Sequence, residues 1–153
     1  MNKKVKKLNF TYFARVWIIV VSIVNFGDSL QYFKDNSLLS RLIYTQTPHY
    51  ANPVFGRIYG IFNFLLAALR FSCAVDIHNK SLYNLTLLSF ALTFGNTFTE
   101  VVVFRTASVN FAILSNLALS GISVISLLFG FKFVCEEAAT DLESDTFLRT
   151  KRS

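Results

Sequence analysis

Four apolar runs, each about twenty residues long, constrain this chain more than any other feature of its sequence. They cover residues 8–27, 54–75, 82–104 and 111–133. The hydrocarbon core of a bilayer is roughly 30 Å thick and takes about 20 apolar residues in helical form, so each run is long enough to cross it. We therefore expect an all-α, polytopic membrane protein whose residues 1–134 form a four-transmembrane-helix bundle.

The first run has a second interpretation, because it follows the basic segment KKVKK and contains Arg15. A short apolar run after a basic N-terminus can be a cleaved signal peptide. This run is longer than such a peptide needs, and GDSLQYF follows it rather than a cleavage site of small residues. The sequence thus predicts a retained helix.

The segments outside the runs carry their own signals. In the first loop, NSLLSRLIY predicts a short interfacial helix that Asn36 or Ser37 could cap; a lid over a lipid site is the alternative. The apolar side of this helix would consist of Leu38, Leu39, Leu42 and Ile43. Residues 135–153 are acidic and poor in apolar residues before turning basic at RTKRS, which predicts a flexible cytosolic tail.

The distribution of basic residues predicts the topology. Toward the side of the two termini lie Lys3, Lys4, Lys6, Lys7, Arg15, Arg70, Lys80, Lys132, Arg149, Lys151 and Arg152, and toward the other side lie Lys34, Arg41, Arg57 and Arg105. By the positive-inside rule, both termini and the turn between the second and third runs should be cytosolic. A net charge of +6 would suggest nucleic acid in a soluble chain. Here the basic residues gather at membrane edges, so we expect no nucleic-acid partner.

Small and polar residues recur along one face of each run. In the first run they are Thr11, Arg15, Ser22, Asn25 and Ser29; in the second Gly56, Gly60, Asn63, Ala67, Arg70 and Ala74; in the third Thr86, Ser89, Thr93, Asn96, Thr97 and Glu100; in the fourth Asn116, Ser120, Ser123 and Gly130. Such faces let membrane helices approach closely and hydrogen-bond to each other. A packed bundle is the favoured interpretation, and a substrate conduit is the alternative.

Charged residues inside the runs should have partners, because an ionised group at the centre of a membrane helix costs about 2.5–3.5 kcal/mol on insertion scales. Arg57 and Glu100 fall at similar depth near the same ends of neighbouring runs, so we predict a structural ion pair. Arg70 lies nearer the cytosolic side, where it could snorkel, with Asp76 as a candidate partner.

The turn between the second and third runs concentrates Asp76, His78, Asn79 and Lys80, and we call residues 76–80 the hinge turn. The chain has only two histidines, which this topology places on opposite sides of the membrane, so a metal site built from several histidines is not expected. The sequence also has no CxxC, GxSxG or glycine-rich nucleotide motif, and we expect no cofactor. The hinge turn is better interpreted as helix caps, with Asn79 or Ser81 capping the third run, or as a partner-binding surface.

The segment LRFSCAVDIHNKSLYNLTL, which contains the hinge turn, resembles the hallmark of the sterol C-4 demethylation scaffold family, known in fungi as ergosterol biosynthetic protein twenty-eight and present in animals. The resemblance extends to GDSLQYFKD, LIYTQTPHYANPVFGRIYGIF and FTEVVVFRTASV, and it covers roughly residues 10–134. The order and position of the hinge-turn residues are its most specific element. The acidic tail after Cys135 does not resemble a family feature.

The resemblance implies a non-catalytic protein of the endoplasmic reticulum membrane that tethers three enzymes. These are the C-4 methyl sterol oxidase, the NAD-dependent C-3 dehydrogenase that decarboxylates, and the 3-keto reductase. It assigns no catalytic or cofactor-binding residue. Two alternatives stay open: a small lipid or sterol transporter or binding protein, which would need a cavity or groove built from the polar faces, and an integral membrane enzyme. Homo-oligomerisation stays open as well.

Overall fold

The structure, a computed structural model, describes the backbone of residues 3–35 and 37–152 and the side chains of residues 10–35, 37–49 and 51–131. Within these ranges every regular element is a helix: α1 (Lys3–Lys34), α2 (Ser37–Leu42), the 3-10 helix η1 (Pro48–Tyr50), α3 (Pro53–Val75), α4 (Lys80–Val102) and α5 (Phe111–Arg152). Four segments are long and apolar enough to cross a membrane: Phe10–Lys34, Pro53–Val75, Lys80–Val102 and Phe111–Phe131. The predicted all-α polytopic fold is confirmed.

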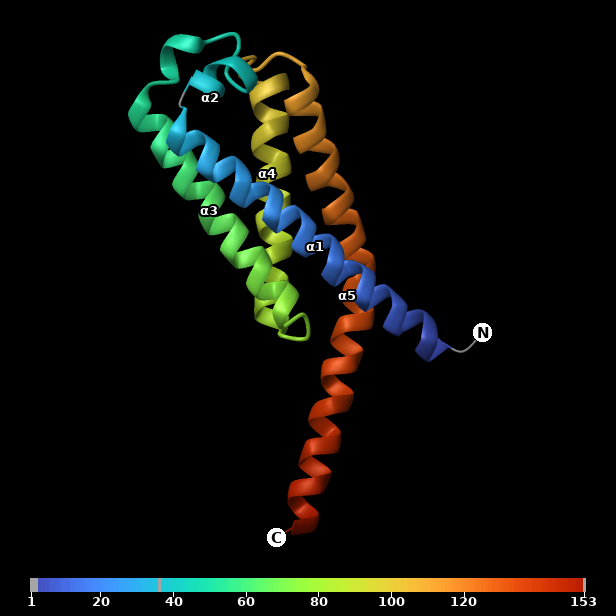
Figure 1. The fold of residues 1–153 in the computed structure, drawn as a ribbon. Coiled ribbons are helices and arrows are strands. Elements are labelled where there is room, and N and C mark those ends of the chain that lie inside the picture. Colours follow the sequence, from blue (N-terminus) through green and yellow to red (C-terminus); the bar gives the residue numbers. More distant parts are fainter. Residues whose placement is uncertain (1–2, 36, 153) are drawn as a thin grey trace.

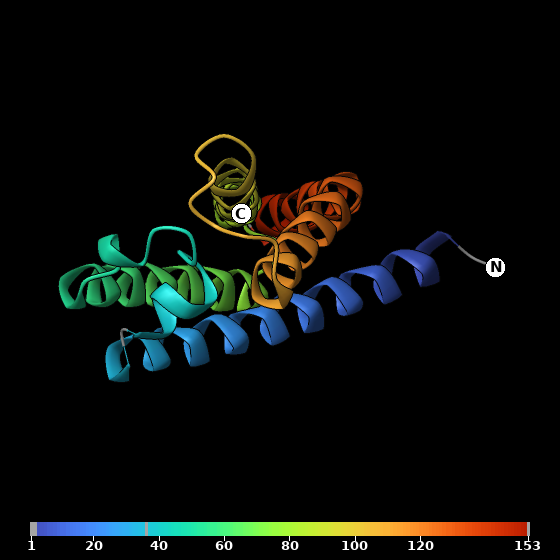
Figure 2. The ribbon, with the colours of Figure 1, turned by 90° about the horizontal axis from the view of Figure 1, so that it is seen from above.

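The four long helices form two pairs, α1 with α3 and α4 with α5 (Figures 1 and 2). The hinge turn joins the pairs at one end of the bundle, which we call the hinge end. The opposite end, here the loop end, carries α2, η1 and the α4–α5 turn. From the hinge end, α3 and α4 diverge toward the loop end (Figure 1). The two pairs therefore meet closely at one end and separate toward the other.

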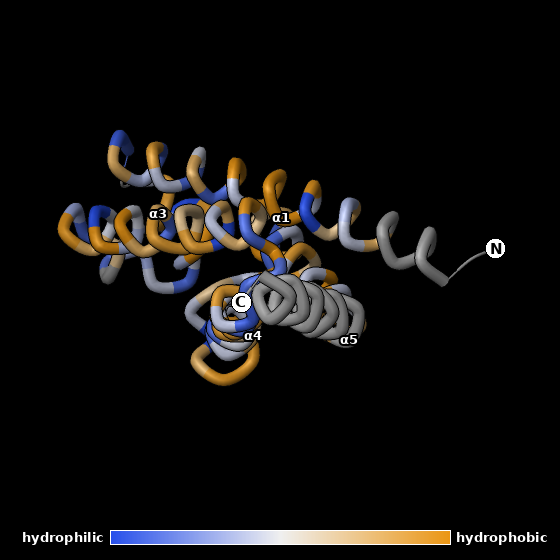
Figure 3. Tube along the Cα trace, turned by 90° about the horizontal axis from the view of Figure 1, so that it is seen from below, coloured by the Kyte–Doolittle hydropathy of each residue, from blue (hydrophilic) through white to orange (hydrophobic). Residues whose placement is uncertain are grey.

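Apolar side chains cover the outside of the bundle. Phe13, Ile23, Phe71, Leu88 and Phe129 are all exposed, and Figure 3 shows hydrophobic residues recurring along α1 and α3. In water such a surface would drive aggregation. In a bilayer it is the surface that faces lipid.

The α1–α3 interface uses the predicted small and polar face of α3, all of whose members are buried. Two serines of α1 donate across it: Ser22 Oγ to the Ala67 carbonyl at 2.7 Å, and Ser29 Oγ to the Gly60 carbonyl at 2.8 Å. Hydroxyl groups reach a facing carbonyl only where small residues let the backbones approach closely. Glycine and alanine in α3 provide that approach.

Helix α1 is longer than the sequence analysis predicts, since it continues beyond Gly27 to Lys34. Gly27 does not end the helix, because packing on α3 continues past it. Ser29 bonds to Gly60, and the Tyr32 and Tyr59 rings meet edge to face with centroids 5.0 Å apart. Tertiary contacts thus outweigh the local signal of one glycine.

The hinge end holds the hydrophobic core, to which all four long helices and the hinge turn contribute. Its buried members are Ala14, Ile18, Val21, Cys73, Ala74, Ile77, Tyr83, Phe90 and Leu127. Polar groups at its edge are paired across helices: Trp17 Nε1 donates to Ser123 Oγ at 2.9 Å, and the Tyr83 hydroxyl donates to the Leu127 carbonyl at 2.7 Å. This half of the bundle is densely packed.

The loop end is closed by hydrogen bonds between the α1–α3 loop and the α4–α5 turn, which we call the loop latch. Thr45 Oγ1 lies 2.6 Å from Ser108 Oγ, and Asn110 Nδ2 donates to the Leu42 carbonyl at 2.7 Å. These bonds connect the two helix pairs where α3 and α4 have diverged. The loop latch therefore spans the separation between the pairs.

The short helix predicted in the first loop is present as α2. Before its start, Asp35 Oδ1 accepts a hydrogen bond from the Ser37 N–H at 2.9 Å; Ser37 is the first residue of the helix, and the other predicted cap, Asn36, lies outside the described residues. Bonds from Ser37 lower the pKa of the Asp35 carboxyl below its ordinary value. Leu39, one of the four residues of the predicted apolar side, is fully buried.

Helix α5 continues without a break to Arg152, so residues 135–152, predicted as a flexible tail, have a helical backbone. Neither glycine nor proline occurs between Cys135 and Arg152, and nothing local ends the helix. The flexibility of this segment and its cytosolic location stay predictions.

Candidate functional site

The hinge turn contains the C-cap of α3, Asp76, and the N-cap of α4, Asn79. The Asp76 N–H donates to the Ser72 carbonyl at 3.0 Å and closes α3, and the Asp76 carbonyl accepts from the Asn79 N–H at 3.3 Å. Asn79 is the N-cap of α4, and its Oδ1 accepts from the Leu82 N–H at 3.2 Å. Of the two caps that the sequence offers for α4, the structure uses Asn79 rather than Ser81.

One apolar residue anchors the hinge turn while the polar ones face outward. Ile77 has no exposed surface and belongs to the hydrophobic core. Asp76, Asn79 and Lys80 are exposed, and His78 is half-buried. The four residues predicted as partner-binding therefore lie together on the surface of the hinge end, and partner binding itself stays a prediction.

Arg70 neither snorkels nor pairs with Asp76, which were the two options drawn from the sequence. It is 2% exposed, and its guanidinium donates to Ser89 Oγ at 3.3 Å and to Thr93 Oγ1 at 3.0 Å. Its central carbon also lies 3.9 Å from the centroid of the Phe90 ring, in a cation–π contact. These partners all belong to α4, so Arg70 fastens α3 to α4 just inside the hinge turn.

Arg57 and Glu100 both lie toward the loop end, where α3 and α4 have diverged. The Glu100 carboxylate accepts a hydrogen bond from the Thr106 hydroxyl in the α4–α5 turn, and Arg57 is exposed. The described residues show no ion pair between the two.

The pair between Arg57 and Glu100 stays a proposal that a double-mutant cycle tests. A coupling energy above about 0.5 kcal/mol between Arg57→Glu and Glu100→Arg would support it.

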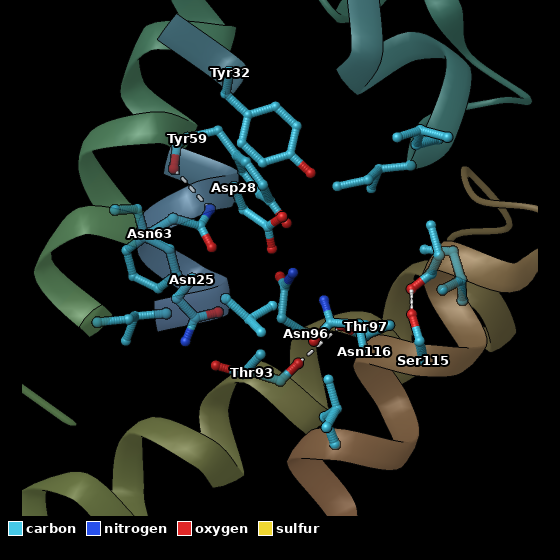
Figure 4. Close-up of a pocket in the computed structure, with 18 of the residues that line it drawn as sticks. Asn25, Asp28, Tyr32, Tyr59, Asn63, Thr93, Asn96, Thr97, Ser115 and Asn116 are labelled. Atoms are coloured by element: carbon cyan, nitrogen blue, oxygen red, sulfur yellow. Dashed lines mark hydrogen bonds between the residues drawn. The ribbon is translucent and has the colours of Figure 1, made fainter. Parts of the chain in front are cut away.

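A cavity of about 600 Å³ lies between the two helix pairs in the loop-end half of the bundle (Figure 4). All four long helices and the segment after α2 line it. Its most polar residues are Asn25, Asp28, Asn63, Asn96 and Asn116. Figure 4 shows the Asn96 and Asn116 side chains, from α4 and α5, pointing into the space that the Asp28 carboxylate of α1 also faces. Part of the predicted polar faces therefore lines a cavity instead of packing helix on helix.

Aromatic residues form the upper wall of the cavity toward the loop end. Tyr32 and Tyr59 pack edge to face, and Tyr44 packs against Phe55 with ring centroids 5.5 Å apart. Burial and the nearby Glu100 carboxylate raise the pKa of Tyr44 to about 12. The Tyr44 hydroxyl is thus a neutral group at physiological pH.

The cavity ends against the hydrophobic core of the hinge end. Val21 lines the cavity and also belongs to the core, where Ile18 and Phe90 are fully buried. A conduit across the membrane would need a polar path through this half of the bundle. The described side chains instead form a cavity closed at the hinge end.

Asp28 and Tyr32 follow the end of the first apolar run, so the sequence predicts them in the loop and not as cavity residues. The signal was present, because Asn25, Asp28 and Tyr32 continue the polar face of the first run at helical spacing. This polar pattern goes unrecognised when the first run is taken to end at Gly27.

Comparison with known proteins places the chain in a family. A family model described as "Erg28 like protein" matches residues 14–125. This chain belongs to the Erg28 family. The "Ergosterol biosynthetic protein 28 homolog" of Mus musculus is 36% identical over 125 residues, which cover 82% of this chain and 89% of that protein. The Homo sapiens homolog is 35% identical with the same coverage, and the Saccharomyces cerevisiae protein is 23% identical over 109 residues, 71% of this chain and 74% of that protein.

The Erg28 match confirms the family resemblance inferred from the sequence. It includes the hinge turn and every residue that lines the cavity, from Val21 to Leu119. The part of α5 after residue 125 lies outside it. No solved structure matches the chain significantly.

Proposed function

We propose that this chain is a non-catalytic scaffold of sterol biosynthesis in the endoplasmic reticulum membrane. Its partners would be the C-4 methyl sterol oxidase, the C-3 dehydrogenase that decarboxylates, and the 3-keto reductase. Membership of the Erg28 family carries this proposal, since the relatives are named as ergosterol biosynthetic proteins. A scaffold helps because it raises the effective concentration of one enzyme near the next, which matters most for a poorly soluble intermediate.

The orientation that fits this role has both termini and the hinge turn in the cytosol, as the basic residues predict. The exposed groups of the hinge turn would then lie on the cytosolic side, together with the part of α5 that continues beyond Phe131. Both would be accessible to enzymes at the membrane surface.

Protease added to intact microsomes should remove a tag from either terminus in this orientation.

Co-purification tests the scaffold directly. The tagged chain, recovered in a mild detergent from membranes of sterol-making cells, should bring down at least one of the three enzymes. An unrelated four-span protein of the same membrane, carrying the same tag, is the control for shared lipid. Recovery of none of the enzymes, or conversion of a 4-methyl sterol by the purified chain alone, would contradict the proposal.

Replacing Asp76, His78 and Lys80 with alanine should weaken enzyme capture without unfolding the bundle. Exposed charge pairs each contribute about 0.2–1 kcal/mol, so loss of the exposed Asp76 and Lys80, together with the half-buried His78, should reduce capture by roughly tenfold rather than abolish it. Asn79 stays unchanged because it caps α4. The measurement is the amount of each enzyme recovered per molecule of tagged chain at a series of salt concentrations. Capture through exposed charges should weaken as the ionic strength rises.

A loop-end variant with Lys34 and Arg41 changed to alanine is the control for removing the two exposed charged groups of the hinge turn, and it leaves Arg57 in place for its proposed pair with Glu100. It should retain capture, because those residues would face the lumen. Equal loss in both variants would mean that the hinge turn has no specific role.

A further inference from the structure

The proposed tether makes no use of the cavity at the loop end. Its volume of about 600 Å³ falls within the range of roughly 300–1,000 Å³ that is usual for small-molecule sites. Its lining is mostly apolar, with a few polar groups, as is typical of sites that bind one amphipathic molecule. The cavity is therefore large enough and mixed enough in character to hold a ligand.

One polar group of the cavity lining lacks a protein partner. Asn25 Nδ2 is shut off from solvent and has no hydrogen-bond partner among the described residues. Asn63 uses its Nδ2 to donate to the Tyr59 carbonyl. Asn63 lies ten residues into α3, which is about 15 Å from the start of the helix at 1.5 Å per residue. An unpaired amide such as that of Asn25 is costly to bury, and rotation of this side chain toward the cavity would let a ligand or water hydrogen-bond to it.

The charge of the lining selects against anions. Among the described side chains, Asp28 is the only carboxylate that lines the cavity, and neither lysine nor arginine does. A phosphate or a carboxylate would meet no cation there, and Asp28 would repel it. Amide and hydroxyl groups, in contrast, can both donate to and accept from a neutral hydroxyl or keto group.

The cavity opens toward lipid between α3 and α4. Three apolar residues that line it are about half exposed: Ile58 at 57%, Phe62 at 49% and Leu92 at 59%. They belong to the two helices that diverge from the hinge end (Figure 1). The loop latch closes the bundle above them. A ligand would enter sideways from the bilayer.

We propose that this cavity binds one neutral sterol through its hydroxyl or keto group. A rigid ring system suits the apolar walls, because it loses less conformational entropy on binding than a flexible acyl chain does. The choice of a sterol among neutral amphiphiles rests on the sterol-pathway role proposed above. The cavity itself, its polar lining and the absence of lysine and arginine from its described lining stand independently of that role.

The test uses the purified full chain in lipid nanodiscs with a photoactivatable 3-hydroxy sterol. Labelling should saturate, should map to peptides of α3, α4 or α5 that line the cavity, and should be displaced by an unlabelled 4-methyl sterol. Ala112→Trp, which fills the cavity, and Asn96→Leu, which removes a polar group, should each weaken binding about tenfold, equivalent to roughly 1.4 kcal/mol. Asn96→Leu changes little volume, so it remains informative if Ala112→Trp unfolds the chain.

Matched controls lie on the same helices. Ala118→Trp on α5 and Asn84→Leu on α4 alter exposed residues outside the cavity and should leave labelling unchanged. The proposal is overturned if labelling does not saturate, if Asn96→Leu labels like Asn84→Leu, or if phosphatidylcholine or a sterol 4-carboxylate competes as well as the neutral sterol. No partner enzyme is present, so a chain that captures the enzymes but binds no sterol refutes the cavity site and leaves the scaffold standing.

Discussion

Sterol-making cells that lose this chain should accumulate C-4 methylated sterol intermediates severalfold. The reason is that a poorly soluble intermediate released by one enzyme would have to find the next by diffusion in the membrane, at a much lower effective concentration than on a shared scaffold. Sterol composition measured by mass spectrometry, before and after removal of the chain, checks this expectation.

The activities of the three enzymes in detergent extracts are the control for this experiment. Each should be unchanged per molecule of enzyme, because the proposed scaffold would contribute no catalytic group. Loss of one enzyme's activity in extracts would show that the chain is needed for that enzyme's chemistry or stability. An unchanged sterol composition would contradict the tethering role.

Replacing Gly60 with valine should destabilise the bundle by about 1–3 kcal/mol, the usual cost of forcing extra atoms into a packed interface. Even a single Cβ at this position would lie 3.0 Å from the Phe33 ring and 3.3 Å from the Ser29 carbonyl oxygen. The branched side chain would push α1 away from α3 and strain the bond from Ser29 Oγ to the Gly60 carbonyl. Thermal unfolding in detergent, followed by circular dichroism, measures the loss.

The same substitution at Gly27 is the matched control. A Cβ there has no neighbour within 4 Å, so Gly27→Val should be neutral or slightly stabilising, since valine favours the helix more than glycine does. If the two variants melt at the same temperature, the close α1–α3 approach does not contribute to stability as described.

The sequence sufficed for the four membrane-spanning helices and for the contact face of α3. Long apolar runs leave little choice in a bilayer, and the small residues of α3 identified its contact face because only they permit a close approach to α1. Asn79 was one of the two caps that the sequence offered for α4, since a side chain that caps a helix acts on its own neighbours in sequence.

The cavity could not be predicted from sequence, because polar faces look the same whether they pack or line a space. Thr86 and Asn96 belong to one predicted face of α4, yet Thr86 is fully buried and Asn96 lines the cavity. The difference arises from the angle at which α3 and α4 diverge, which depends on both helix pairs. The surroundings of Arg70 were missed for a related reason, since its partners lie on α4, 19 and 23 residues away in sequence.

The two ends of the bundle are closed by bonds of unequal strength. At the hinge end the closure is covalent and is reinforced by the buried Ile77. At the loop end it depends on hydrogen bonds such as those of Thr45 and Asn110, each worth about 1 kcal/mol. Breathing of the molecule should therefore begin at the loop end and widen the space between the helix pairs while the hinge end stays folded. Hydrogen exchange would record this as a gradient of protection along α3 and α4, fastest near their loop-end termini.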